Sequence, residues 1–283
     1  MKTISIKRLL TSILLGSLIA ATAFYGCTDN PGVAPTDGKQ QLDDPSFSKI
    51  RPLLPPNPSF GIFETTTLGD NVDSILAYGP EEAGFKGIFL YAYENTYHQF
   101  LDAAVSEGYV YRVARLVRSE IANNNWTVVR NRVDYCSSYG ANVFWVDDGL
   151  SGGDGYNITK AQIDSVASIV HGHTGKLLAT AEWDKTTVIS NKSWFTNVDI
   201  VMPYEYDYTA SQLNGFLAAV RDSLSGKSII AFLGYNVAEG SQDPQLHDYI
   251  EVARNYNSYI FYYTEGCASL GPLVYYLKTN YGM

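Results

Sequence analysis

The chain has 283 residues, enough for two small domains or for one large domain with a leading segment. Hydrophobic residues make up 46% of it and charged residues 17%, proportions typical of a globular chain and not of a disordered one. A formal net charge of -9 has the wrong sign for gripping phosphate backbones, so we expect no nucleic-acid partner. Three Cys and four His are too few for a zinc site or a dense disulfide framework, and we expect neither a metal nor a cofactor.

The first residues have the pattern of a secretory signal. A basic start precedes an apolar run, residues 9–24, that is too short for a comfortable membrane span and stops at Gly26-Cys27. The Gly-Cys end resembles the cleavage box of bacterial lipoproteins, in which the Cys becomes the lipidated first residue. The resemblance implies a signal peptide over residues 1–26, a lipid anchor on Cys27 as the only membrane attachment, and a place in the periplasm or at the cell surface. Ordinary secretion with cleavage nearby is the alternative.

A second segment, residues 27–59, separates this leader from the folded part. It is rich in Pro, Asp, Gly, Gln and Ser, and it contains seven of the 11 Pro residues of the chain. Because it lacks a periodic apolar face, we predict an extended tether. The folded domain is therefore expected to occupy residues 60–283.

Within that domain, short apolar runs alternate with amphipathic helical patterns. Both sides of each run are apolar, as expected for parallel strands that are buried on two faces. The predicted strands are residues 60–65, 87–93, 110–116, 142–147, 176–182, 198–204, 228–235 and 259–264.

The segments between the strands carry helix signals. Apolar residues recur at i, i+3, i+4 and i+7 from Ile163, from Leu213 and from Leu246. Thr159 with Gln162 has the form of a capping box that starts a helix. Eight strand–helix units in roughly 225 residues predict an α/β fold of the (β/α)8 TIM barrel type. A doubly wound sheet is the alternative, but it usually carries a Gly-rich loop after its first strand, and this chain does not.

In such a barrel the chemistry lies where the strands end and the following loops begin. The residues at those positions are mostly carboxylates and aromatic rings. They are Glu64, Tyr91, Tyr93, Glu94, Arg115, Asp147, Asp148, Glu182, Trp183, Asp184, Tyr204, Glu205, Asp207, Tyr235, Asn236, Glu239, Tyr263 and Glu265. His, Cys and Lys are missing from this set, which argues against Schiff-base, His-metal and thiol chemistry at this end of the barrel.

Carboxylates combined with aromatic rings suit the cleavage of glycosidic bonds. A protonated acid donates to the leaving oxygen while an ionised carboxylate attacks or stabilises the sugar carbon. Aromatic faces pack against the C–H faces of sugar rings, and Asn or Arg side chains hydrogen-bond to the hydroxyls. The sequence therefore predicts a carbohydrate substrate.

Two segments carry a resemblance to a known group of enzymes. Asp147-Asp148 ends the fourth predicted strand, and Met202-Pro203-Tyr204-Glu205 ends the sixth. Together they resemble the barrel glycoside hydrolases of the chitinase-like sort. The resemblance implies that an acid after strand four and an acid after strand six face the same cleft.

The expected roles follow from this arrangement. Glu205 is predicted to be the general acid/base, Asp147 or Asp148 the ionised partner, and Glu182 an assisting residue. The remaining predicted substrate-binding residues are Glu64, Tyr91, Arg115, Trp183, Tyr204, Asp207, Tyr235, Asn236, Tyr263 and Glu265. Each acid also has a structural interpretation: Asp147-Asp148 as a helix cap or a loop-ordering pair, and Glu205 as a salt-bridged rim residue. Arg115 would equally serve as a counter-ion for these acids.

The main hypothesis is a glycoside hydrolase that acts on a polysaccharide or oligosaccharide. A non-catalytic glycan-binding lipoprotein with a hydrolase-like barrel is the second hypothesis, because binding alone uses the same aromatic rings. A barrel phosphodiesterase or lyase with an acid-bound divalent cation is the third. Cys136 and Cys267 are predicted near opposite ends of the barrel, so we expect no disulfide between them.

Overall fold

The structure is a computed structural model of the whole chain. The leader and the tether, residues 1–59, lie outside the part of the chain that it describes. The described residues are 60–64, 80, 84–90, 97–150, 152, 155–203, 209–234, 246–256, 259–264 and 270–281.

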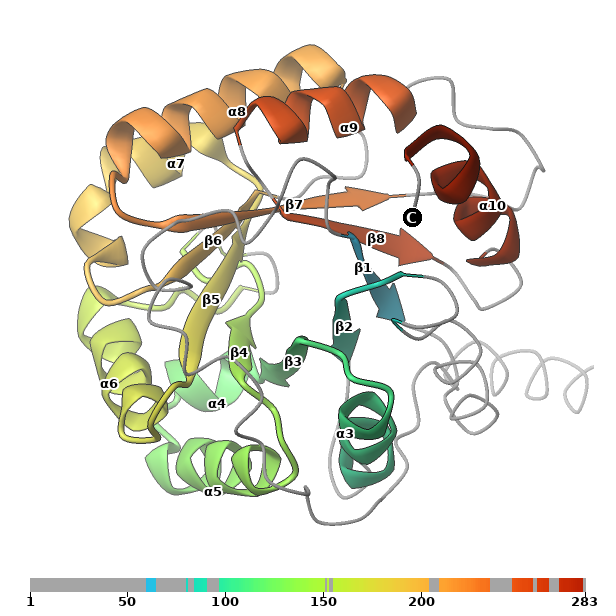
Figure 1. The fold of residues 1–283 in the computed structure, drawn as a ribbon. Helices are drawn as coiled ribbons and strands as arrows, with labels where there is room; N and C mark the ends of the chain where they lie inside the picture. Colours follow the sequence, from blue (N-terminus) through green and yellow to red (C-terminus); the bar gives the residue numbers. More distant parts are fainter. Residues whose placement is uncertain are drawn as a thin grey trace, which may run out of the picture.

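Eight parallel strands form a closed ring in sequence order, and β8 pairs with β1 (Figure 1). Each strand overlaps one of the predicted strands, and the sequential order is not that of a doubly wound sheet. The strands are β1 (Phe60–Glu64), β2 (Gly87–Leu90), β3 (Tyr111–Leu116), β4 (Val143–Val146), β5 (Leu177–Glu182), β6 (Ile200–Pro203), β7 (Ser228–Gly234) and β8 (Tyr259–Thr264).

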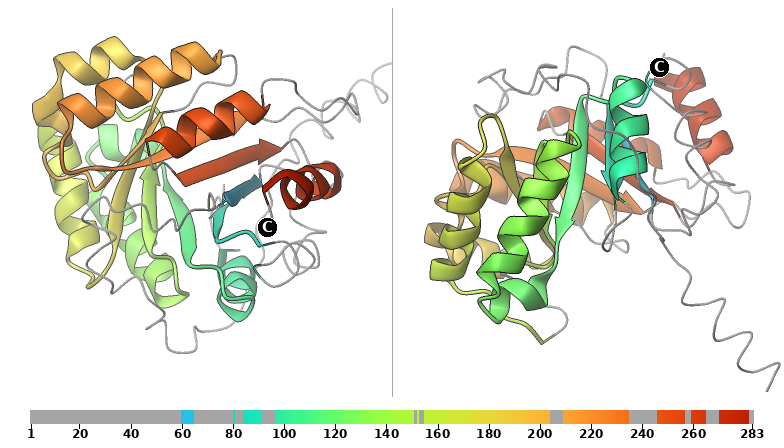
Figure 2. Two further views of the ribbon diagram at one scale, coloured as in Figure 1. Left: turned by 45° about the horizontal axis from the view of Figure 1, so that its top comes forward. Right: turned by 90° about the horizontal axis from the view of Figure 1, so that it is seen from below.

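Helices lie around the outside of the ring, as two further views show (Figure 2). Within the described ranges a helix follows every strand except β1, because most of the segment between β1 and β2 lies outside them. The helices are α3 (Tyr97–Ser106), α4 (Arg118–Ala122), α5 (Trp126–Ser138), α6 (Lys160–His171), α7 (Lys185–Ser190), the 3-10 helix η3 (Lys192–Phe195), α8 (Ala210–Ser223), α9 (Leu246–Asn255) and α10 (Leu270–Tyr281).

The helix signals of the sequence are confirmed in detail. α6 begins with a complete capping box, in which the Thr159 hydroxyl accepts from the Gln162 N–H and the Gln162 side chain accepts from the Thr159 N–H. The apolar positions at helical spacing are the buried ones: Ile163, Val166, Ala167 and Val170 on α6, and Leu213, Phe216, Leu217 and Val220 on α8. These faces pack against the sheet because burying them removes apolar surface from water.

Strand side chains alternate between two buried layers. Along each strand, every second residue joins the core cluster between the strands and the helices. Examples are Ala114, Phe144, Val146, Leu178 and Val201. The residues between them are also buried but lie outside that cluster. Examples are Val113, Val143, Trp145, Ala179 and Met202. Since successive side chains of a strand point to opposite faces, the second set fills the inside of the ring, which is a packed interior and not a pore.

Cys136 is buried on α5, and Cys267 lies outside the described residues. Of the helices that the structure describes, none combines the length and the apolar character that crossing a membrane requires.

Candidate active site

The predicted site residues that the structure describes with their side chains lie at the carboxyl ends of β3, β4 and β5 or directly after them. Glu64 and Tyr263 are described only as backbone, near the carboxyl ends of the neighbouring strands β1 and β8. Eight predicted residues lie outside the described part of the chain: Cys27, Tyr91, Tyr204, Glu205, Asp207, Tyr235, Asn236 and Glu265.

An ion pair lies where β3 and β4 end. Arg115 Nη2 is 3.0 Å from Asp147 Oδ2, and the two side chains are 7% and 15% exposed. Arg115 belongs to the inward-facing residues of β3, and Asp147 continues the inward series of Val143 and Trp145 on β4. The Arg115 guanidinium carbon lies 5.4 Å from the centre of the Trp145 ring, within the range of a cation–π contact. The mouth of the barrel therefore holds a carboxylate paired with a guanidinium that also contacts an aromatic side chain.

Asp148 has different partners from Asp147. Its carboxylate lies 3.5 Å from the guanidinium of Arg118, the first residue of α4. Arg118 also donates to the backbone carbonyls of Asp147 at 3.3 Å and of Asp148 at 2.9 Å. These contacts favour the loop-ordering interpretation for Asp148, while Asp147 remains the acid of this pair that reaches the mouth.

Glu182 is fully buried at the end of β5. Its two carboxylate oxygens accept from the Leu150 backbone N–H at 3.0 and 3.2 Å. Because side chains alternate along a strand, Glu182 lies on the same face of β5 as Leu178 and Thr180. Leu178 belongs to the core between the strands and the helices. The contacts therefore support a role in ordering the loop after β4, and the assisting catalytic role expected from the sequence stays a prediction.

The next two residues, Trp183 and Asp184, also differ in their surroundings: Asp184 caps a helix, and Trp183 is exposed. Asp184 caps α7, where it accepts from the Thr186 N–H at 2.9 Å and from the Thr187 hydroxyl. The bond from the Thr187 hydroxyl is the largest of the causes that hold the pKa of Asp184 below its ordinary value. Trp183 instead leaves 42% of its surface exposed, and Tyr156, in the loop after β4, leaves 40%. These exposed aromatic side chains are suited to stacking on a ligand at the rim of the barrel.

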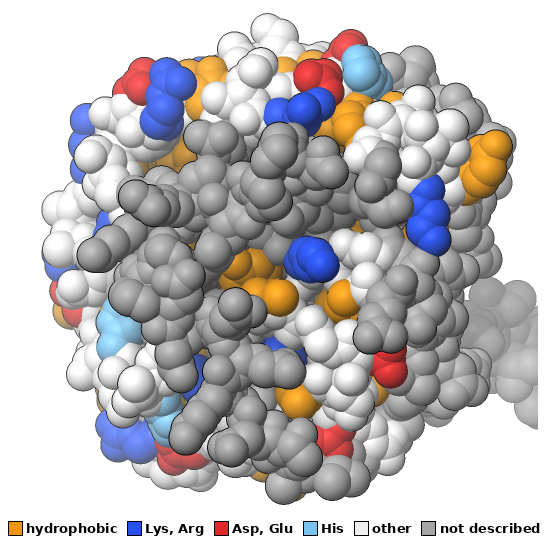
Figure 3. Space-filling model, in the orientation of Figure 1, with side chains coloured by type: hydrophobic (Ala, Val, Ile, Leu, Met, Phe, Trp, Pro, Cys, Tyr) orange, Lys and Arg blue, Asp and Glu red, His pale blue; other side chains and the backbone are white. Residues whose placement is uncertain are grey.

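The space-filling view shows the opposite face of the molecule, at the amino ends of the strands, where basic and hydrophobic side-chain atoms lie near the centre and acidic atoms lie farther out (Figure 3). In the part of the chain with described positions, no group of three or more His, Cys, Asp or Glu is placed to hold a metal ion.

Arg118 is the functional candidate that the sequence analysis missed. It stands three residues after Arg115 and two residues after the end of β3. An arginine at such a position was a usable signal, because chemistry in barrels gathers where strands end.

Comparison with known proteins shows the fold but does not single out a family. No protein-family model and no curated protein sequence matches the chain. The carboxyl transferase domain of Rhizobium etli pyruvate carboxylase is similar over 90% of this chain and 49% of that chain, with 12% identity and a TM-score of 0.58. A GH18 chitinase from Pseudoalteromonas aurantia is similar over 78% of this chain and 99% of its own, with 7% identity and a TM-score of 0.54. A GH27 β-L-arabinopyranosidase from Geobacillus stearothermophilus covers 78% and 72%, with 9% identity and a TM-score of 0.51.

These proteins carry out different reactions on one architecture, so the likeness defines a parallel α/β fold of the kind found in TIM-barrel enzymes. The chain also spans about half of the carboxyl transferase structure, as the 49% coverage states. Any particular activity has to be argued from the site.

Proposed function

We propose that this chain is a complete (β/α)8 barrel glycoside hydrolase that acts on an uncharged polysaccharide or oligosaccharide. The observation that carries the proposal is the Asp147 carboxylate, paired with Arg115 at the mouth of the barrel, where Arg115 also lies over the Trp145 ring. An ionised carboxylate at the mouth is one half of the acid pair that glycosidic cleavage requires.

The other half of the pair is assigned from the sequence. Glu205 follows β6 by two residues, and we propose that it protonates the leaving oxygen as the general acid. Asp147 then stabilises or attacks the sugar carbon. Trp183 stacks on a sugar ring, together with the predicted aromatic residues of the other loops. Asp148 and Glu182 are assigned to loop ordering in this proposal.

Local charge supports a neutral substrate over an anionic one. Arg115 and Arg118 each lie in an ion pair with an aspartate. An anionic ligand at this site would have to displace a carboxylate, whereas sugar hydroxyls both donate and accept and add no charge. In sequence, the segments after the other strands add further acids and few cations, among them Glu94, Glu205, Asp207, Glu239 and Glu265. This balance also weighs against a phosphodiester or a carboxylate as the substrate.

A glycan-binding protein without catalysis is the second candidate. The exposed rings of Tyr156 and Trp183 favour it as much as they favour hydrolysis, because stacking requires no acid. In both cases we propose that the Cys27 lipid anchors the domain at the periplasmic or outer surface of a bacterial membrane.

The test is an assay of reducing ends released from a panel of neutral polysaccharides (starch, mannan, xylan, chitin) and acidic ones (alginate, polygalacturonate). We expect release from at least one neutral polymer. Asp147→Asn is expected to lower the rate by about a thousandfold and Glu205→Gln by about a hundredfold or more, the range for lost carboxylate catalysis.

The matched control is Asp222→Asn, which removes an exposed acid at the end of α8. It should hydrolyse at the rate of the unmodified protein. Undiminished hydrolysis by Asp147→Asn would remove Asp147 from the mechanism. Binding of a neutral polymer without any release of reducing ends would support the second candidate instead.

A further inference from the structure

The turn after β4, defined here as the β4 turn, comprises residues Asp147 to Leu150 and carries the proposed catalytic carboxylate. We infer that Arg118 and Glu182 are positioning residues that clamp this turn from its two sides and so fix the direction of the Asp147 side chain. The inference rests on the proposed function only in taking Asp147 as the reacting carboxylate.

Arg118 holds the β3 side of the turn. Its guanidinium reaches the carbonyls of both Asp147 and Asp148 and the carboxylate of Asp148, and its side chain is 3% exposed. Asp148 has a φ of 41°, a left-handed conformation that is rare outside Gly, Asn and Asp. The guanidinium supplies polar partners to the backbone in this conformation, so it stabilises the reversal that sends Asp147 and Asp148 in different directions.

Glu182 holds the β5 side of the turn. Its buried carboxylate has an N–H donor from Leu150, while the Gly149 N–H donates to the Ala181 carbonyl at 3.3 Å. A buried carboxylate is tolerated only with such partners, and hydrogen bonds to a charged group are stronger than those between neutral groups. The last part of β5 therefore binds two successive backbone N–H groups of the turn.

Gly149 shows how closely the turn is packed between these supports. A Cβ at this position would lie 2.8 Å from Trp194 Cη2, closer than real Cβ atoms approach, and 3.1 Å from Glu182 Oε1, tighter than nine in ten real Cβ contacts. The backbone of the turn therefore rests directly on the indole and the carboxylate, and a small movement of either would move the turn.

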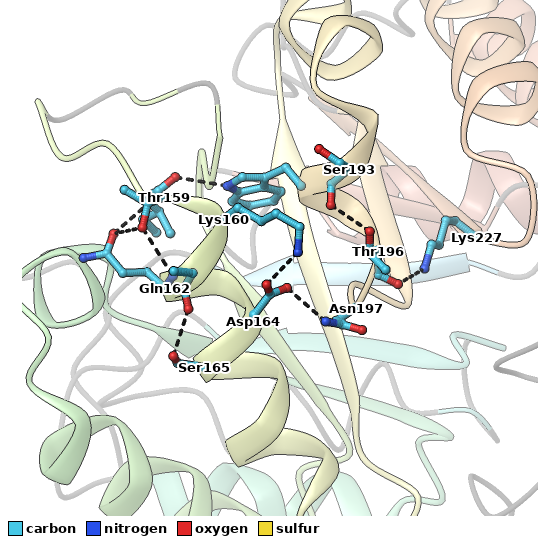
Figure 4. A network of polar contacts seen from close by, with 12 residues as sticks. Thr159, Lys160, Gln162, Asp164, Ser165, Ser193, Thr196, Asn197 and Lys227 are labelled. Carbon is cyan, nitrogen blue, oxygen red and sulfur yellow. Dashed lines mark hydrogen bonds and ion pairs between the residues drawn. The ribbon is translucent and has the colours of Figure 1, made fainter.

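The far end of the same loop is anchored as well. Trp194 Nε1 donates to the Ile158 carbonyl at 3.0 Å, directly before the capping box of α6. Close by, Asp164 of α6 accepts from Lys160 and from Asn197, which ties the first turns of α6 to the segment before β6 (Figure 4). Because Trp194 contacts both Gly149 and Ile158, the two ends of the loop are set by one side chain.

Together these contacts fix the position of Asp147 through the residues on both sides of the β4 turn. The Asp147 carbonyl is bound by Arg118, its carboxylate by Arg115, and the residues after it by β5 and Trp194. Preorganised geometry of this kind matters for catalysis, because a displacement of about 1 Å in a reacting group costs about a hundredfold in rate. Glu182 thus contributes to the reaction through the turn and not through contact with the substrate.

The experiment compares Glu182→Gln and Arg118→Lys with Glu251→Gln and Arg254→Lys, which change an exposed ion pair on α9. Three quantities are measured: amide hydrogen exchange at Leu150, the NMR resonance of the Asp147 carboxyl carbon, and kcat and KM on the neutral polymer identified above. In Glu182→Gln the amide oxygen still accepts from Leu150, but the bond is no longer made to a charged group, so we expect Leu150 exchange to rise about tenfold. In both site variants the Asp147 resonance should shift, and kcat should fall about a hundredfold with KM little changed. The α9 variants should match the unmodified protein in every measurement.

The outcomes separate this inference from the proposed function. If no polymer is hydrolysed, the hydrolase proposal fails, and exchange and the Asp147 resonance still decide whether the clamp exists. An unchanged Asp147 resonance in both site variants would overturn the clamp whatever the activity. Loss of kcat in Glu182→Gln with unchanged Leu150 exchange and an unchanged Asp147 resonance would also overturn it, and would return Glu182 to a direct catalytic role.

Discussion

Strand β3 has a buried arginine near each end, and the two are held in different ways. Near the amino end, Arg112 donates through Nε to the Gly140 carbonyl at 2.6 Å and through Nη1 to the Tyr109 carbonyl. Near the carboxyl end, Arg115 pairs with the carboxylate of Asp147. Burial lowers the pKa of Arg112 to about 10, so it is still a cation at neutral pH.

The difference indicates what each end of the barrel does. At the amino end the partners are neutral backbone groups, and Asn142 completes the set by accepting from the Arg112 N–H at 2.9 Å and donating to the Val110 carbonyl at 2.8 Å. This network is closed and joins β3 to β4, so we expect it to contribute stability. At the carboxyl end the partner of the arginine is a carboxylate that is still 15% exposed, which leaves the pair accessible to a ligand. The two ends of a barrel commonly divide stability and chemistry in this way.

The largest expected effect on stability comes from breaking the amino-end network. Arg112→Met should lower the free energy of unfolding by about 3 kcal/mol, because two buried carbonyls lose their donor. Urea unfolding followed by circular dichroism measures this quantity. The kcat of the remaining folded protein should stay unchanged, since the site lies at the other end of the strand.

The control for this variant is Arg130→Met, which removes an exposed arginine from α5 and should leave stability nearly unchanged. A loss of kcat in Arg112→Met without a loss of stability would contradict the division between the two ends.

A smaller effect on stability, combined with an effect on rate, is expected at the carboxyl end. Gly149→Ala places a methyl group against Trp194 and Glu182 and should cost about 2 kcal/mol through overpacking. Because the β4 turn has to move, kcat should fall as well, in contrast to Arg112→Met. Thermal unfolding and the reducing-end assay measure the two changes.

Gly215→Ala on α8 is the matched substitution, since its Cβ would meet only Lys185 Nζ at 3.5 Å. We expect it to raise stability by about 0.5 to 1 kcal/mol, because alanine favours a helix interior. If both alanine variants behave alike, the close packing under the β4 turn has no energetic consequence.

The two ends also differ in how much the sequence reveals about them. The strands were predictable because each is apolar on both faces, and α6 and α8 because their caps and apolar spacing agree. That same two-sided burial hides which face of a strand points inward. Alternation predicts that Asp147 shares a face with Trp145 and that Glu182 shares one with Thr180, but it does not predict which of these faces lines the ring.

The contacts of Arg118 and Trp194 lie beyond local patterns altogether. Arg118 reaches the β4 turn from a helix that begins 29 residues before Asp147, and Trp194 reaches Ile158 over 36 residues of chain. Such contacts depend on how the barrel closes and how the helices pack, and no short-range spacing encodes them. The sequence could therefore predict that Asp147, Asp148 and Glu182 lie where β4 and β5 end, but it could not predict their separate contacts.

The smallest predicted effect concerns pH and lies at the amino end. His171, at the end of α6, has Nε2 2.6 Å from Asp199 Oδ2, and the same oxygen accepts from the Leu178 N–H at 2.8 Å. The hydrogen bond with Asp199 is the main cause that raises the pKa of His171 above 6.5, while burial and Lys227 oppose it. Because the folded pKa is raised, this pair contributes its full stability below the unfolded pKa, and the contribution is lost as pH rises through the folded pKa.

The His171 side chain is 38% exposed, so solvent screening limits the contribution to less than about 1 kcal/mol. His171→Gln should therefore lower the free energy of unfolding more at about pH 5.5 than at about pH 8.5, on either side of an ordinary histidine pKa. In an Asp199→Asn background, where the amide oxygen still accepts from Leu178, the same substitution should lose most of this pH dependence. A pH dependence that persists in that background would assign the effect to a partner other than Asp199, and it would show that the amino end is not held by this pair. Urea unfolding of the four proteins at both pH values completes the double-mutant cycle and separates the two cases.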